Sequence, residues 1–208
     1  MQITLSNTGK RFNREWIFRH CSYTFTSGKS YAITGPNGSG KSTLLQVIAG
    51  ATLHNEGTVD YQTTDNGQQT TDSAYHYKSI SIAAPYLELI EEMKAKEMLS
   101  FHSKFKPLIQ TLSVEEMLKI VGLENAINKQ LRYFSSGMKQ RLKLAQAFFS
   151  NTPVLLLDEP TTNLDADGIA LYLHLIKNYT KDKLVIVSSN VKEEYGFCEE
   201  VIEISDYK

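Results

Sequence analysis

The alternation of apolar and polar side chains predicts that the chain begins with β-strands. The period of two that marks a half-buried strand runs through residues 3–5 and again through residues 23–26. A short β-prone run follows at residues 31–34. After a glycine-rich loop, the apolar positions of residues 43–49 fall at helical spacing and end at Gly50. The first quarter therefore predicts two strands followed by a strand, loop and helix.

Residues 57–61 have the composition of another strand, and Asp65, Asn66 and Gly67 form the strongest hairpin-turn signal in the sequence. The stretch 63–73 is polar, and we interpret it as a surface excursion because β-prone sequence resumes at residues 79–82.

Helical spacing dominates from about residue 86 to residue 150. Helices are predicted at residues 93–102, 114–121 and 138–149, with Ser113 as the N-cap of the second helix. The charged run at residues 88–97 is typical of a solvated helix face. We interpret the whole stretch as an inserted helical lobe.

The last quarter predicts a parallel sheet. Residues 154–157 and 184–187 are apolar without alternation, as expected of strands covered on both faces. Residues 169–179 between them predict a crossover helix, and residues 201–204 a last, outer strand. The fold class is therefore α/β.

Composition narrows the possible partners. The 208 residues carry 22 Lys and Arg against 23 Asp and Glu, so we expect no general attraction to nucleic acid or anionic lipid. No apolar stretch approaches the roughly 18 to 20 residues that cross a bilayer, and no secretory signal is visible at the N-terminus. A cytoplasmic location is expected. Cys21 and Cys198 are expected to be reduced and buried.

A phosphate-binding loop is the strongest chemical signal in the sequence. Residues 35–42 read Gly, four residues, Gly-Lys-Ser, between a predicted strand and a predicted helix. Backbone amides of such a loop converge on phosphates, Lys41 reaches the β- and γ-phosphates, and the Ser42 hydroxyl is a ligand for Mg²⁺. The candidate nucleotide-binding residues here are Gly35, Asn37, Gly38, Ser39, Gly40, Lys41, Ser42 and Thr43.

Two acids follow the buried strand at residues 154–157. Asp158 is a candidate Mg²⁺ ligand, and Glu159 is placed to polarise an attacking water as general base. Two acids at a strand end are commonly a solvated turn when they stand alone. The phosphate-binding loop upstream favours the catalytic interpretation.

Residues 158–165, Asp-Glu-Pro-Thr-Thr-Asn-Leu-Asp, resemble the Walker B strand and D-loop of the ATP-binding cassette (ABC) family. The resemblance implies a P-loop NTPase (RecA-like) core with an antiparallel β subdomain and an inserted α-helical subdomain. In this interpretation residues 1–208 form one domain, in which 1–85 and 151–208 make the core and about 86–150 the helical subdomain. Phe12, 29 positions before Lys41, matches the family's adenine-stacking aromatic; core packing is the alternative, and Trp16 is a weaker candidate.

The family's LSGGQ signature corresponds here to residues 134–138, Phe-Ser-Ser-Gly-Met. Ser135 and Gly137 match, whereas Phe134, Ser136 and Met138 depart from it. The resemblance implies that Ser135 and Gly137 contact the γ-phosphate bound to the opposite subunit of a head-to-tail dimer. Without the family, this segment is simply a helix cap.

Two further departures concern catalysis. Pro85, or Ala84 in a shifted alignment, stands where the family carries a glutamine that touches metal and water. Ser189, with Asn190 beside it, replaces the switch histidine, and neither side chain can carry its positive charge. Because one positioned group in such a site is worth about 10²-fold or more, slow hydrolysis is expected.

The leading hypothesis is an ATP-hydrolysing subunit that dimerises around Mg-ATP, with Glu159, Lys41 and Ser189 as catalytic residues, and drives a separate membrane permease. The resemblance implies a second cassette subunit, identical or not, and a location on the inner face of the cell membrane. Tyr86, Leu87, Leu89 and Met93 are candidates for the groove that receives the permease. Two alternatives are a soluble nucleotide switch without transport and the catalytically weak half of a cassette heterodimer.

Overall fold

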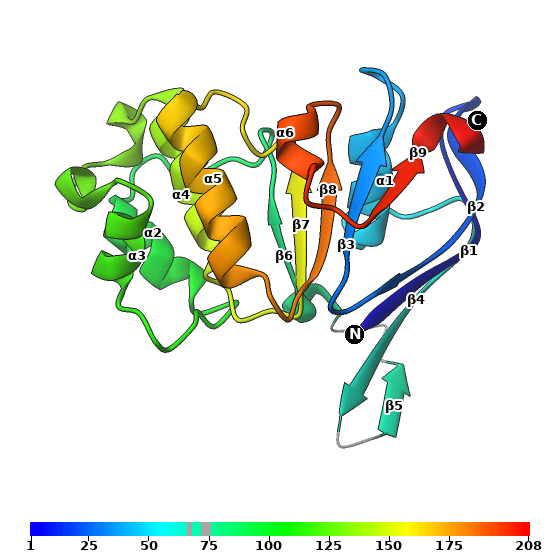
Figure 1. The fold of residues 1–208 in the computed structure, drawn as a ribbon, viewed down its shortest axis with the longest axis horizontal. Helices are drawn as coiled ribbons and strands as arrows, with labels where there is room; N and C mark the ends of the chain where they lie inside the picture. Colours follow the sequence, from blue (N-terminus) through cyan, green and yellow to red (C-terminus); the bar gives the residue numbers. More distant parts are fainter. Residues whose placement is uncertain (66–67, 72–75) are drawn as a thin grey trace.

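The structure is a computed structural model that describes residues 1–65, 68–71 and 76–208. Its first sheet is antiparallel, with the strand order β2-β1-β4-β5. The strands are β1 (Gln2–Phe12), β2 (Glu15–Thr26), β4 (Glu56–Asp65) and β5 (Gln68–Thr71). These strands lie at one end of the long axis of the molecule (Figure 1).

The second sheet is parallel throughout, with the order β6-β7-β8-β3-β9. Its strands are β3 (Ser30–Thr34), β6 (Ile80–Ala83), β7 (Val154–Asp158), β8 (Leu184–Ser188) and β9 (Glu200–Glu203). The edge position of β9 confirms the outer strand predicted at residues 201–204. The α/β fold class is likewise confirmed.

Alternate residues of the central strands enter different cores. Leu155 and Leu157 of β7 pack in one core with Phe148 of α4 (Ser136–Phe148) and Leu175 of α5 (Ala166–Tyr179). Leu156, between them, packs in a second core that contains residues of α1 (Lys41–Ile48) and of the antiparallel sheet. All of β7 and β8 is buried, which confirms strands covered on both faces.

The remaining helices are short. They are α2 (Ala95–His102), α3 (Val114–Ile120) and α6 (Lys192–Tyr195), with 3₁₀ turns at His76–Ser79, Glu124–Ala126, Leu131–Tyr133 and Ile204–Tyr207. Figure 1 shows α2 and α3 at the end of the molecule opposite the antiparallel sheet. The predicted N-cap of α3 is confirmed, because the Ser113 hydroxyl accepts from the backbone N–H of Glu116 at 3.2 Å.

The prediction of a helix face along the charged run was wrong for its first part. Only from Ala95 is the run helical, and residues 88–94 form a connecting segment. Glu91 pairs there with Lys139 at 2.5 Å, and Glu92 with Arg132 at 3.5 Å. The backbone N–H groups of Leu131 and Arg132 donate to the oxygens of Met93 and Glu91, so backbone bonds hold the segment and these exposed ion pairs add little.

Strands β1 and β2 are much longer than the alternation predicted. Register shifts interrupt their pairing, and Asn7 and His20 adopt positive φ angles of 51° and 55°. Such irregularities change which face a side chain occupies, so the period of two is lost although the strands continue. A two-residue turn joins the strands, with Asn13 at φ 53° and Phe12 paired with Glu15.

The polar stretch after residue 62 is partly strand. β4 and β5 pair antiparallel from Gln62 with Thr71 to Asp65 with Gln68. Of the predicted hairpin turn, Asn66 and Gly67 lie outside the described residues.

Within the described ranges, no helix has the length and apolar character needed to cross a membrane. Cys21 and Cys198 are both free, as predicted, but only Cys21 is fully buried and Cys198 is partly exposed. Burial raises the pKa of each thiol to about 12, and the nearby Glu199 adds to the increase at Cys198.

Candidate nucleotide-binding site

The phosphate-binding loop follows β3, in the interior of the parallel sheet, and leads directly into α1. Gly40, the residue before the helix, adopts a left-handed conformation with φ 105°. A Cβ on Gly40 would lie 2.4 Å from Cγ2 of Ile17, so glycine is required where the loop passes β2. The motif thus packs its backbone against the antiparallel sheet as the chain turns into α1.

Lys41 is the first residue of α1 and only 5% exposed. Its ammonium donates to the backbone oxygens of Gly35, at 2.8 Å, and Pro36, at 3.1 Å. Among the described residues no side chain caps α1, and its first turn has no acid. The ammonium and the positive end of the helix dipole therefore meet at the loop, an arrangement suited to an anion.

The two predicted acids lie at the end of β7, beside the end of β8. Asp158 is 1% exposed and pairs in register with Ser188. Burial raises the pKa of Asp158; the nearby hydroxyls of Ser188 and Ser42 lower it, Glu159 raises it, and Lys41 lowers it. A cation bound here would favour the ionised form that burial disfavours.

Glu159 follows with a positive φ of 41°, which is a strained conformation for a residue with a side chain. Its backbone N–H donates to the oxygen of Ser188 at 2.9 Å. The chain therefore turns sharply as it leaves β7, and Glu159 lines a cavity of about 250 Å³. The lining residues are Asn37, Glu159, Thr161, Thr162, Ser189, Asn190, Val191 and Glu194.

Unpartnered polar atoms concentrate at this site. In the described part of the chain, the buried side-chain oxygens without a hydrogen-bond partner are Ser39 Oγ, Asp158 Oδ1, Ser188 Oγ and Glu194 Oε2. All of them lie at, or follow, the carboxyl ends of β3, β7 and β8, the usual ligand position in such sheets. Buried polar groups are nearly always paired, so this set indicates a polar ligand. Hydroxyl and carboxylate oxygens of this kind fit phosphate and Mg²⁺.

The two candidates for the switch position differ in what they contact. Ser189 is fully buried, and its hydroxyl accepts from the backbone N–H of Val191 at 2.9 Å. The exposed Asn190 instead donates from Nδ2 to Oδ1 of Asn37, in the phosphate-binding loop, at 2.7 Å. The catalytic role of Ser189 stays a prediction, and this geometry favours Asn190 as the side chain that reaches the loop.

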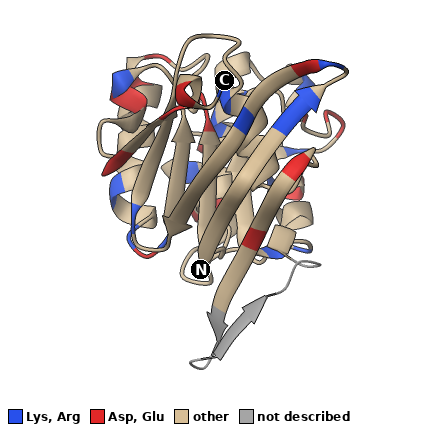
Figure 2. Cartoon of the chain, turned by 90° about the vertical axis from the view of Figure 1, so that its right-hand side faces the viewer, with Lys and Arg blue, Asp and Glu red and all other residues tan. Residues whose placement is uncertain are grey.

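Phe12 lies at the end of β1 and is 50% exposed, which disfavours the alternative of core packing. The Lys10 ammonium is 4.8 Å from the centroid of its ring. The ring of Trp16 has Arg19 at 4.4 Å and Arg11 at 5.5 Å. Figure 2 shows basic positions near the hairpin end of these strands. An exposed aromatic ring among cations suits a stacked base with phosphates attached.

The signature residues line a second cavity, of about 460 Å³. The Ser135 hydroxyl caps α4 by accepting from the backbone N–H of Met138 at 3.2 Å. This cavity is lined by Gly122, Ser135, Ser136, Gly137, Met138, Arg141, Asn163, Leu164 and Asp165. It has no lining residue in common with the cavity at Glu159. The two cavities nevertheless adjoin along the chain, because Thr161 and Thr162 line the one at Glu159 and the next three residues line this one.

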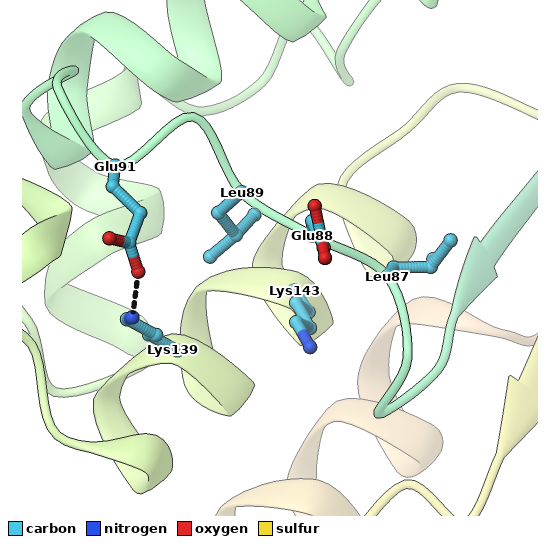
Figure 3. Close-up of a pocket in the computed structure, with 6 residues that line it drawn as sticks. All are labelled: Leu87, Glu88, Leu89, Glu91, Lys139 and Lys143. Atoms are coloured by element: carbon cyan, nitrogen blue, oxygen red, sulfur yellow. Dashed lines mark hydrogen bonds and ion pairs between the residues drawn. The ribbon is translucent and has the colours of Figure 1, made fainter.

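The segment at Pro85, the predicted substitute for the family's glutamine, is held through a backbone oxygen. Lys143 of α4 donates to the oxygen of Pro85 at 2.6 Å. Beyond Pro85, a cavity of about 450 Å³ is lined by Leu87, Glu88, Leu89, Glu91, Lys139 and Lys143. Figure 3 shows these side chains and the ion pair of Glu91 with Lys139.

Tyr86, predicted from the sequence only as a groove residue, also has its phenol near Asp158, the candidate Mg²⁺ ligand. Burial raises the pKa of Tyr86, the Gln46 amide lowers it, and Asp158 raises it. Glu194, which no sequence pattern indicated, is buried beside Thr161. Neither residue belongs to a motif, and only the folded chain brings them to the site.

Comparisons with known proteins agree with these features. A family model described as ABC transporter matches residues 18–162. YybJ of Bacillus subtilis, an uncharacterized ABC transporter ATP-binding protein, is 32% identical over 98% of this chain and 92% of its own length. The tungstate uptake system ATP-binding protein TupC of Peptoclostridium acidaminophilum is 30% identical over 97% and 94%. The solved dimer of MJ0796, a bacterial ABC transporter cassette, matches with a TM-score of 0.81 at 26% identity, over 97% and 94%.

Proposed function

The chain belongs to the ABC transporter family as an ATP-binding subunit, and from this premise we propose that two cassettes enclose two Mg-ATP molecules and drive a separate membrane permease. The observation that carries the proposal is that the signature residues line a cavity of their own, with no lining residue in common with the cavity at Glu159. No residue of the phosphate-binding loop lines the signature cavity, and the solved MJ0796 cassette is a dimer; both observations support a site that a second cassette completes. The partner is a copy of this chain or a related subunit.

Each residue has a physical task in this proposal. Phe12 stacks on adenine, while Lys41 and the amides of residues 38–43 bind the phosphates. Ser42 and Asp158 hold Mg²⁺, which supplies charge neutralisation at the phosphates. Glu159 orients the attacking water and accepts its proton.

The second cassette contributes Ser135 and Gly137 with the N-terminus of α4, and its positive dipole end approaches the γ-phosphate. Closure is therefore favoured while the γ-phosphate bridges both subunits, and hydrolysis removes the bridge. Opening and closing of the dimer is the motion passed to the permease.

Hydrolysis by this chain is proposed to be slow. Pro85 has no polar side chain to meet metal or water, and Asn190 offers an amide donor without charge. The same departures support the narrower proposal that the chain is the weaker half of a heterodimer. Measurable ATP turnover by the purified chain alone, abolished by Lys41→Ala, would count against that version.

The permease is proposed to dock beside α4. Leu87 and Leu89 offer apolar contacts there, and Lys139 and Lys143 border the same cavity (Figure 3). This docking would hold the protein in the cytoplasm at the inner face of the cell membrane. The cargo is not fixed by this subunit, because the motor does not contact it.

The decisive experiment is Glu159→Gln, analysed by gel filtration with and without ATP and Mg²⁺. The substitution removes the base but keeps the shape of the site, so turnover should fall by about 10²-fold or more and ATP should trap a dimer. Lys41→Ala in the same background should stay monomeric, because it removes the phosphate contact. A Glu159→Gln protein that remains monomeric at saturating ATP would contradict the proposed function.

A further inference from the structure

A buried carboxylate lies beside the predicted general base and has no role in the function proposed above. Glu194 in α6 is 2% exposed. Its Oε1 accepts from the backbone N–H of Thr161 at 2.8 Å and also from the Thr161 hydroxyl. Its backbone oxygen accepts from the Tyr172 hydroxyl of α5 at 2.6 Å. Glu194 is therefore fixed to α5 on one side and to the segment after β7 on the other.

The segment that Glu194 holds is strained. Glu159 and Asn163 are both in the left-handed region, with φ angles of 41° and 65°. Asn tolerates this conformation, whereas for Glu159 it costs on the order of 1 kcal/mol or more and persists only where the surroundings fix it. Thr161 stands midway between the two. One oxygen of Glu194 takes both of its hydrogen-bond donors, so this carboxylate is one contact that maintains the turn; the Gln140 amide, which donates to the oxygen of Pro160 at 2.8 Å, is another.

A structural role alone is a poor explanation for an acid at this position. Taking a carboxylate out of water costs several kcal/mol, and a well-packed apolar side chain would often be as stable. Oε2 of Glu194 moreover has no hydrogen-bond partner among the described residues, although it is buried. An unsatisfied buried oxygen of this kind is explained by a functional role or by a bound water in the cavity that Glu194 lines.

The same short segment is also tied to the phosphate-binding loop. Asn190, four residues before Glu194, donates to Asn37 at 2.7 Å. Residues 190–194 therefore contact the loop at one end and Thr161 at the other, along the cavity that Glu159 lines.

We propose that Glu194 is a positioning residue of the hydrolytic site, which acts through Thr161 to hold Glu159 in its working orientation. This inference rests on the proposed function, because it concerns the residue that activates water. Glu194 itself touches neither nucleotide nor water in this role. It should therefore affect the rate of hydrolysis more than the affinity for ATP.

The test compares Glu194→Met, which has similar length but no acceptor, with Glu194→Gln, whose amide oxygen can still accept from Thr161. Glu193→Gln, at the exposed neighbouring position, is the matched control. We expect Glu194→Met to lower kcat at least about tenfold with the nucleotide Kd within about twofold, and Glu194→Gln to restore most of the loss. Amide hydrogen exchange at Thr161 should be at least about tenfold faster in Glu194→Met.

The proposal is overturned if Glu194→Met lowers kcat no more than Glu193→Gln, if Glu194→Gln is folded but gives no rescue, or if exchange at Thr161 is unchanged. Should Glu194→Met not fold, Thr161→Val removes only the hydroxyl donor; a severalfold lower kcat supports the proposal, and an unchanged kcat overturns it.

ATP binding and trapping of the Glu159→Gln dimer test the proposed function separately. Amide hydrogen exchange at Thr161 tests the contact between Glu194 and Thr161 even if the proposed function is contradicted.

Discussion

At the scale of single residues, the side chain that reaches the phosphate-binding loop from the end of β8 is a neutral amide. Asn190 donates to Asn37, whereas the hydroxyl of the buried Ser189 is engaged by the backbone of Val191. An amide can donate one hydrogen bond to a phosphate oxygen, but it adds no positive charge. The two residues should therefore differ in kinetic importance.

We predict that Asn190→Ala lowers kcat about tenfold with nearly unchanged nucleotide affinity, because it removes a positioned donor. Ser189→Ala should mainly lower the free energy of unfolding, by about 1 kcal/mol, since it leaves the N–H of Val191 without its acceptor. Steady-state ATPase assays and urea denaturation measure the two effects. A larger loss of kcat in Ser189→Ala would reverse this assignment.

Residues of this site outside the motifs were not accessible to sequence reasoning. Glu194 stands in the run Lys192-Glu193-Glu194-Tyr195, where adjacent acids are typical of a solvated turn. Glu194 is buried and Glu193 exposed only because of how the single turn of α6 is oriented on the folded protein. For Lys41, Asp158 and Glu159, by contrast, motif spacing already predicts the position of each residue. The loop of Lys41 directly follows one strand, and the two acids stand at the end of another, so each motif is local in sequence.

At the scale of elements, a neutral histidine links the end of α2 to the chain after α4. His102 Nε2 donates to the Ser150 hydroxyl at 2.9 Å, since that hydroxyl itself donates to the oxygen of Gln146 at 2.6 Å. Burial, with a smaller contribution from Lys106, lowers the pKa of His102 to about 4. The folded protein therefore keeps this imidazole neutral at a pH where the unfolded chain is protonated.

The consequence is a loss of stability in acid. The contribution of His102 is fully present above the unfolded pKa of about 6.5 and is lost as the pH falls toward 4, on the order of 3 kcal/mol in total. His102→Gln keeps a donor for Ser150 but cannot titrate. Urea denaturation between pH 7 and pH 4 should show a steeper decline for the natural protein. Parallel curves for the two proteins would contradict the prediction.

The elements that the sequence predicted best are those whose pattern has one physical cause. β7 and β8 are apolar throughout because both faces are covered, and α3 begins at a side chain that caps it. The long β1 and β2 were only partly found, because register shifts move their side chains between faces. The start of α2 was placed too early, since the backbone of residues 91–94 bonds to residues 130–132 and the helix begins only at Ala95.

At the scale of the whole molecule, we predict that two variants with different defects complement each other if two cassettes pair head to tail. Lys41→Ala breaks the phosphate-binding loop, and Ser135→Arg blocks the signature, so each variant alone should be inactive. A mixed pair retains one intact site, made from the loop of one chain and the signature of the other. An equal mixture should recover about a quarter of the natural ATPase activity if pairing is random.

Activity that stays absent in the mixture, while both variants still bind to each other, would contradict the head-to-tail arrangement. The sequence could point to this pairing only through the family resemblance. Which cavity each motif lines is a property of the folded molecule, since residues 135–137 and 35–43 are far apart in sequence and no pattern measures the distance between them.

The two thiols have a practical consequence for such experiments. A maleimide reacts with the thiolate, and with pKa values of about 12 both Cys21 and Cys198 are almost entirely protonated at neutral pH. A cysteine introduced at an open position such as Leu53, which is 81% exposed, would ionise far more readily. Fluorophores can therefore be attached at a chosen point with the native cysteines in place, and the approach of two subunits can be followed by energy transfer between dyes.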